Sequence, residues 1–82
     1  MISVQDYYSN DDGKTTTVEV RNMFRVVQKE TFNVPLEKFT EGIKNYNNGQ
    51  KIQEAFPFLS DEEREFMMSG LTFEEQKSIF GE

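Results

Sequence analysis

The chain has 82 residues, a net charge of -6 at pH 7, 35% hydrophobic residues, and neither cysteine nor histidine. This length fits a single domain over residues 1-82, and the missing thiols and imidazoles exclude disulfides, thiolate nucleophiles and cysteine- or histidine-based metal sites. The sequence shows neither the basic start and following apolar run of a signal peptide nor a stretch of about eighteen apolar residues. We therefore expect neither export nor a membrane span.

The charge is distributed unequally. Residues 1-51 contain seven acidic and seven basic residues, whereas residues 52-82 contain eight acidic residues against only Arg64 and Lys77. The acidic half of the chain repels nucleic-acid phosphates, and it lacks the clustered lysine and arginine that a nucleic-acid-binding surface needs. We therefore predict no nucleic-acid partner. A protein with a basic surface is the partner that we expect for this acidic half. The alternative is an acidic surface that only keeps the protein in solution.

Residues 1-34 are predicted to be β-rich. Apolar and polar residues alternate, and Asp12-Gly13 is typical of a hairpin turn. We therefore expect an antiparallel hairpin or a three-stranded meander. Residues 19-30 remain open, because Val20, Met23, Phe24 and Val27 also have the spacing of one helical face. We favour strands, since β-branched residues lose rotamer freedom in helices.

Residues 35-82 are predicted to be helical. Pro35 suits a first helical turn, and apolar residues then recur with helical spacing, so helices are expected at 36-47 and, more briefly, at 51-56. Ser60-x-x-Glu63 and Thr72-x-x-Glu75 are capping boxes that predict helices at 61-69 and 73-80, and Gly70 can end the first of these two.

The predicted fold class is therefore α+β, an antiparallel hairpin or meander followed by three to four short helices. A small core must take apolar residues from both parts of the chain. The expected core residues are Val18, Val20, Phe24, Val26, Phe39, Ile43, Phe56, Leu59, Phe66 and Phe73.

A calcium loop is the first alternative function. Residues 8-19 place Asn10, Asp12 and Glu19 at the third, fifth and twelfth positions of an EF-hand loop. Tyr8, however, stands where the first carboxylate belongs, and a β-turn explains the same residues. We therefore predict no metal and no cofactor, with weak calcium binding as an alternative.

Two further hypotheses fit less well. Residues 59-75 resemble the start of a DNA-binding helix-turn-helix, but the segment that would enter the major groove is acidic. The paired carboxylates could serve acid-base catalysis, yet they stand where helix caps need them, and neither Ser60 nor Ser69 has a histidine base. We predict a protein that is not an enzyme and has no catalytic residue.

The segment IQEAFPFLSDEEREFMMSGLTFEEQKSIFG resembles the C-terminal half of a group of small, acidic, uncharacterised proteins encoded in bacteriophage genomes. The resemblance covers residues 52-80, and the preceding VPLEKFTEGIKNYNNGQ is similar in kind. A tryptophan often follows the second acidic pair in those proteins, whereas Gln76 stands near that place here. The resemblance implies a viral protein in the host bacterial cytoplasm.

The functional prediction combines the acidic half with this resemblance. We expect a phage accessory protein that binds and modulates a host or viral protein with a basic surface; the alternative is a structural or assembly component of the virus. A homodimer formed by strand pairing at residues 2-8 also remains open. The predicted contact residues are four carboxylates and three apolar anchors: Asp61, Glu62, Glu65, Glu74, Phe58, Met68 and Phe80.

Overall fold

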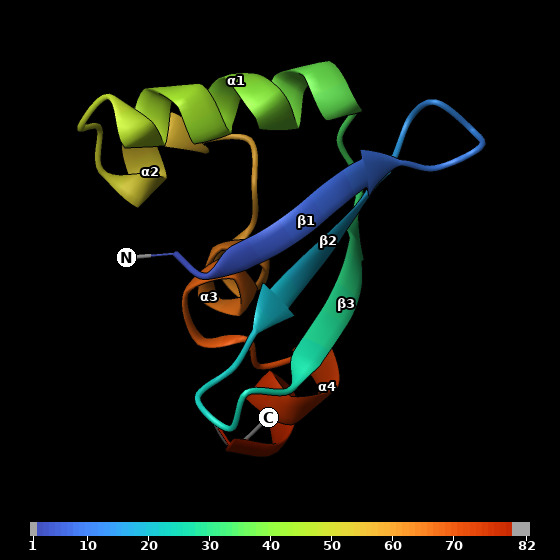
Figure 1. Cartoon of the computed structure of the whole chain (residues 1–82), viewed down its shortest axis with the longest axis vertical. Helices are drawn as coiled ribbons and strands as arrows, with labels where there is room; N and C mark the ends of the chain where they lie inside the picture. Colours follow the sequence, from blue (N-terminus) through green and yellow to red (C-terminus); the bar gives the residue numbers. More distant parts are fainter. Residues whose placement is uncertain (1, 80–82) are drawn as a thin grey trace.

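The computed structural model describes residues 2-79 and contains a three-stranded sheet followed by four helices. The α+β prediction is confirmed, with a meander of strand order β1-β2-β3. The elements are β1 (Val4–Ser9), β2 (Thr16–Arg21), β3 (Val27–Phe32), α1 (Leu36–Asn47), α2 (Ile52–Ala55), α3 (Asp61–Ser69) and α4 (Phe73–Ile79). Figure 1 shows α1 and α2 near one end of the sheet and α4 near the other, beside the β2-β3 loop.

The two faces of the sheet differ as the alternation predicts. Thr16, Val18 and Val20 of β2 are buried toward the helices, while the residues between them are only partly covered. Both neighbouring strands pair antiparallel with β2, so the sheet has one face on the core and one toward solvent. Residues 19-30 belong to β2, β3 and their connecting loop, and the helical alternative for them is wrong.

The core unites the strand and helix parts of the chain. Six of its expected members are buried, and Ile43 and Phe73 pack against them half-buried. Phe32 stands at the centre, with its ring 5.9 Å from Phe39 and 6.1 Å from Phe66. Its stacking with Phe73 at 6.4 Å brings α4 to the same cluster. One continuous aromatic core therefore joins the sheet to α1, α3 and α4.

Two expected core residues are not buried. Phe24 is 77% exposed and Val26 is 52% exposed. Both lie in the β2-β3 loop, where the Oδ1 atom of Asn22 accepts from the Phe24 and Val26 backbone N–H groups. Because this turn interrupts the strand, the two-residue alternation does not continue through it to the core.

Both predicted capping boxes are present. The Glu63 N–H donates to the Ser60 hydroxyl, and the Glu63 carboxylate accepts from the Ser60 N–H at 2.8 Å. Thr72 and Glu75 exchange the same pair of bonds at the start of α4. Gly70 ends α3 in the left-handed conformation with φ 76°, as expected. These local bonds fix where α3 and α4 begin.

Polar residues of β3 hold the start of α4 on the core face of the sheet. The Glu30 carboxylate accepts from the Phe73 N–H at 2.7 Å, and Gln28 donates to the Glu75 carboxylate at 3.0 Å. Glu30 therefore satisfies a helix N-terminal N–H that the capping box leaves free. This explains why Gln28 and Glu30 interrupt the apolar alternation of β3.

We expect Glu30→Ala to lower the free energy of unfolding by about 1 to 2 kcal/mol, because it removes a charge-assisted hydrogen bond at a half-buried helix start. Glu30→Gln keeps an acceptor oxygen and is expected to lose less. Urea denaturation monitored by circular dichroism measures both. Equal losses in the two variants would show that the hydrogen bond contributes little.

Candidate partner-binding surface

The face of α3 turned away from the core carries two of the predicted carboxylates: Asp61, which is exposed, and Glu65, which is half-buried. Asp61, Glu65 and Met68 are spaced four and three residues apart, so they form one stripe along the helix. Phe66 and Met67 point the other way and are buried in the core. The Ser60 cap fixes the start of this helix, and therefore also the direction of the stripe.

The first carboxylate of the stripe is partly neutralised. Asp61 accepts from the Arg64 guanidinium at 2.7 Å, and the side chain of Asp61 is 99% exposed while that of Arg64 is 17% exposed. Arg64 also donates to the Phe56 carbonyl, which anchors the guanidinium to the core. Because the Asp61 side chain is almost wholly exposed, it remains accessible to a partner's cation, although Arg64 offsets part of its charge.

The carboxylates of α4 divide into two roles. Glu74 is exposed, whereas Glu75 is engaged by its cap and by Gln28. The α4 helix is fixed to α3 by Gln76, whose amide donates to the carbonyls of Glu62 and Leu71. Gln76 is 4% exposed, so this amide is a buried bridge that its polar residue type did not predict. It also holds Glu62 and Glu74 on neighbouring helices.

The three predicted apolar anchors differ in how the structure places them. Met68 is 41% exposed and available at the end of the α3 stripe. Phe58 is half-buried, with its ring 6.0 Å from that of Phe56 and the Lys38 ammonium 5.3 Å above it. Phe58 thus packs within the fold and offers little free apolar surface. Phe80 lies outside the described residues.

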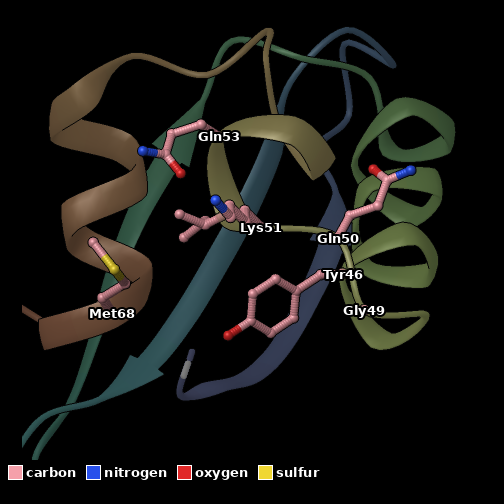
Figure 2. A pocket seen from close by; sticks show the side chains of 7 residues that line it. Tyr46, Gly49, Gln50, Lys51, Gln53 and Met68 are labelled. Atoms are coloured by element: carbon pink, nitrogen blue, oxygen red, sulfur yellow. The ribbon is translucent and has the colours of Figure 1, made fainter.

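A hollow of about 510 Å³ lies beside Met68, between the end of α1, α2 and α3. Figure 2 shows Tyr46 projecting from α1 into the space that faces Met68. Ile52 adds apolar surface, while Lys51 and Gln53 make the lining partly polar. Tyr46 is also half-buried against the core, so it is both a core residue of α1 and part of the lining of this hollow.

The serine hydroxyls of this region form hydrogen bonds with the backbone of α3. The Ser60 hydroxyl accepts the cap bond from Glu63, and the Ser69 hydroxyl donates to the Glu65 carbonyl at 2.9 Å. The acids of the capping boxes are likewise bound to backbone N–H groups. These groups therefore stabilise the helix ends.

The residues of the calcium hypothesis lie in the β1-β2 hairpin. Asn10 bonds to the hydroxyls of Thr15 and Thr17, and Glu19 accepts from the Tyr8 hydroxyl. Asp12 accepts from the N–H groups of Lys14 and Thr15. The strands on both sides replace the helices of an EF-hand, and no three acidic side chains of residues 2-79 gather as metal ligands.

The Asp12 bonds predict a pH dependence of stability. The N–H groups of Lys14 and Thr15 hold the pKa of Asp12 below its ordinary value. Since the unfolded group titrates near pH about 3.9, the stabilisation is fully present above that pH and is lost as pH falls through the lower folded pKa.

We therefore expect Asp12→Asn to be less stable than the wild type at about pH 6, and the difference to shrink below about pH 4. Urea denaturation at a series of pH values measures this. Asp11→Asn is the matched control, because its side chain makes no hydrogen bond among the described residues. A difference that is independent of pH would contradict the role given to the Asp12 carboxylate.

Within residues 2-79, no helix has the length and apolar character needed to cross a membrane. Comparison of the chain with models of known protein families, with curated proteins and with solved structures finds no match.

Proposed function

We propose that the protein is a small, non-enzymatic phage accessory protein that binds and modulates a host protein through the acidic face of α3 and α4. The observation that carries this proposal is the α3 stripe, on which Asp61 and Glu65 lead to the exposed Met68. The viral origin and the host bacterial cytoplasm rest on the sequence resemblance of residues 52-80. The partner is a protein with basic residues next to an apolar side chain.

The carboxylates and the apolar residues of this surface contribute differently to binding. Exposed ion pairs contribute only about 0 to 1 kcal/mol each, so the carboxylates mainly accelerate and orient association. Affinity needs a desolvated apolar contact near the centre of the interface. Met68 and the adjoining hollow supply it, because Tyr46 and Ile52 line the same space. A partner side chain in the hollow would lie next to the Glu65 end of the stripe.

We expect the combined change Asp61→Lys, Glu62→Lys and Glu65→Lys to abolish capture of the partner from phage-infected cells at low salt. The reversal replaces attraction to the basic partner by repulsion. Tagged wild-type and variant proteins are compared by affinity purification and quantitative mass spectrometry. Met68→Ala should reduce capture at both low and high salt, because an apolar contact is not screened.

The matched control reverses three acids away from α3 and α4, at Asp11, Glu37 and Glu41, and so changes the net charge equally. It should leave capture nearly unchanged. Circular dichroism establishes that each variant is folded. Equal loss in both triple variants would mean that net charge alone matters, and detection of the protein in purified virions would instead favour a structural or assembly role.

A further inference from the structure

The two outer strands of the sheet differ in whether their free edges can accept another strand. The sheet has the order β1-β2-β3, so β1 and β3 each have one edge that no strand of residues 2-79 covers. Figure 1 shows β3 along one side of the sheet, with no described segment running beside its outer edge. An uncovered edge presents unpaired backbone N–H and C=O groups, which are a template for an added strand.

The turn before β3 fixes which backbone groups of this strand point outward. The Asn22 N–H donates to the Val26 carbonyl at 2.9 Å, so these two residues are a hydrogen-bonded pair next to the ladder. Bonded and non-bonded pairs alternate along antiparallel strands. By the observed register, the β3 residues that bond to β2 are Gln28, Glu30 and Phe32. The β3 residues that direct their N–H and C=O groups away from β2 are Val27, Lys29 and Thr31.

The free β3 edge, which Val27, Lys29 and Thr31 define, is regular and exposed. The pairing of β2 with β3 runs from end to end without a register shift. All three side chains of the edge are exposed. Outside the ladder, no backbone-to-backbone hydrogen bond of residues 2-79 involves these three residues. The edge therefore has the geometry and the unpaired groups that strand addition needs.

The free edge of β1 is obstructed by its own residues. The register shifts between Val4 and Asp6, and such a bulge bends the strand. The Tyr7 N–H donates to the Asp6 carboxylate at 2.9 Å, so a partner strand cannot use it. Strand pairing at residues 2-8 is therefore disfavoured, and β3 is the better site for an added strand.

The charges of β3 determine which strand suits its free edge. Lys29 lies at the centre of the edge and forms no ion pair within residues 2-79. Glu30, the other charged residue of β3, is instead bound to the Phe73 N–H on the core side. On its paired side, β3 already has Glu19 of β2 opposite Lys29. Opposite charges at directly paired positions stabilise a sheet, so a carboxylate opposite Lys29 suits the free edge as well.

A second copy of β3 does not meet this requirement. In a symmetric antiparallel pair of β3 edges, the two registers with the greatest overlap are centred on Lys29 or on Glu30. The first register places Lys29 opposite its own copy, and the second does the same with Glu30. Like charges at directly paired positions are destabilising. The complementary strand therefore belongs to another protein.

We propose that the free β3 edge binds an extended, acidic segment of another protein by antiparallel strand addition. The backbone of this segment bonds to Val27, Lys29 and Thr31, and a glutamate or aspartate lies opposite Lys29. The residues two positions to either side of that carboxylate are β-branched, since such side chains pack well on a sheet face. An acidic segment differs from the basic surface expected at the α3 stripe, so this inference does not rest on the proposed function.

Amide hydrogen exchange of the full chain, measured for each residue by NMR, tests the state of the edge. The N–H groups of Val27, Lys29 and Thr31 should exchange roughly tenfold or more faster than their neighbours in β3, because only the neighbours are bonded within the ladder. Protection that does not alternate along β3 would overturn the proposal, because the edge would then already be covered.

The probe for binding is a blocked peptide that copies residues 16-21 of β2, TTVEVR, because this sequence already pairs with β3. Its addition should shift the amide signals of the free β3 edge. The same peptide with Glu19→Lys should bind roughly tenfold or more weakly. In the full chain, Thr31→Pro removes an outward N–H without breaking the ladder, so this variant should fold and bind neither peptide.

Charge exchange across the new pair separates recognition from a general effect on the fold. Lys29→Glu in the full chain should reverse the preference between the two peptides. Circular dichroism establishes that this variant is folded. If repulsion from Glu19 prevents its folding, Lys29→Gln is used instead, and it should bind the two peptides alike.

Two binding results would overturn this inference. One is equal affinity of the wild-type chain for the two peptides, which would exclude the role given to the carboxylate. The other is no binding of the TTVEVR peptide up to about 1 mM, the weak limit of specific recognition. Thr31→Pro should capture the partner of the α3 stripe as the wild type does, so failure of one proposal is distinguishable from failure of the other.

Discussion

Phe32→Ala is expected to lower the free energy of unfolding by about 3 to 5 kcal/mol, the usual cost of removing a fully buried aromatic ring. Phe32 has 0% exposure, and its ring meets those of Phe39, Phe66 and Phe73. A domain of this size has a total stability of only about 4 to 12 kcal/mol. The loss therefore removes a large share of what holds the sheet to α1, α3 and α4.

Phe24→Ala is the matched control, because it deletes the same ring from a position that is 77% exposed. Urea denaturation should show a change of less than about 0.5 kcal/mol. If Phe32→Ala fails to fold, Phe32→Leu retains most of the volume and should fold with a smaller loss. Equal losses for Phe32→Ala and Phe24→Ala would contradict the location of the core.

Gly70→Ala is expected to cost about 2 to 5 kcal/mol, from two sources that add. The residue has φ 76°, which disfavours any side chain. A Cβ atom there would also stand 2.7 Å from Cβ and 2.9 Å from Cα of Asn22. Since Asn22 begins the β2-β3 loop, relief of this clash must move backbone and disturb the turn that displays Phe24.

Gly13→Ala separates these two sources. Gly13 has a similar φ of 67° but nothing within 4 Å of an added Cβ, so only the backbone cost of about 1 to 2 kcal/mol remains. The difference between the two variants in urea denaturation measures the close approach of α3 to the loop. A difference near zero would show that the Asn22 contact relaxes without cost.

Gly70 joins α3 to the β2-β3 loop, because it ends α3 and an added Cβ there would meet Asn22 of the loop. A change at Gly70 should therefore disturb the loop more than the start of α3, where the Ser60 cap is independent of it.

Local signals in the sequence determined the helices. The bonds of a capping box join residues three positions apart, so Ser60 with Glu63 and Thr72 with Glu75 specify helix starts without help from the rest of the fold. A glycine that ends a helix acts equally locally. The exposed positions of Asp61 and Glu74 followed from the same caps, because first-turn acids opposite the core face solvent.

Only the tertiary structure decided the role of residues whose partners are distant in sequence. The alternation of apolar and polar residues alone could not locate the β2-β3 loop, in which Phe24 and Val26 are exposed to solvent. The Glu30 carboxylate accepts from the Phe73 N–H, 43 residues away, and Gln76 is buried where its amide donates to the Glu62 carbonyl of α3, 14 residues away. Phe58 is partly covered by Lys38 of α1, which lies far from it in sequence. The periodicity of the sequence predicts which side chains lie on the same face of a helix or strand. Their exposure and their hydrogen-bond partners depend on which distant segments pack against that face.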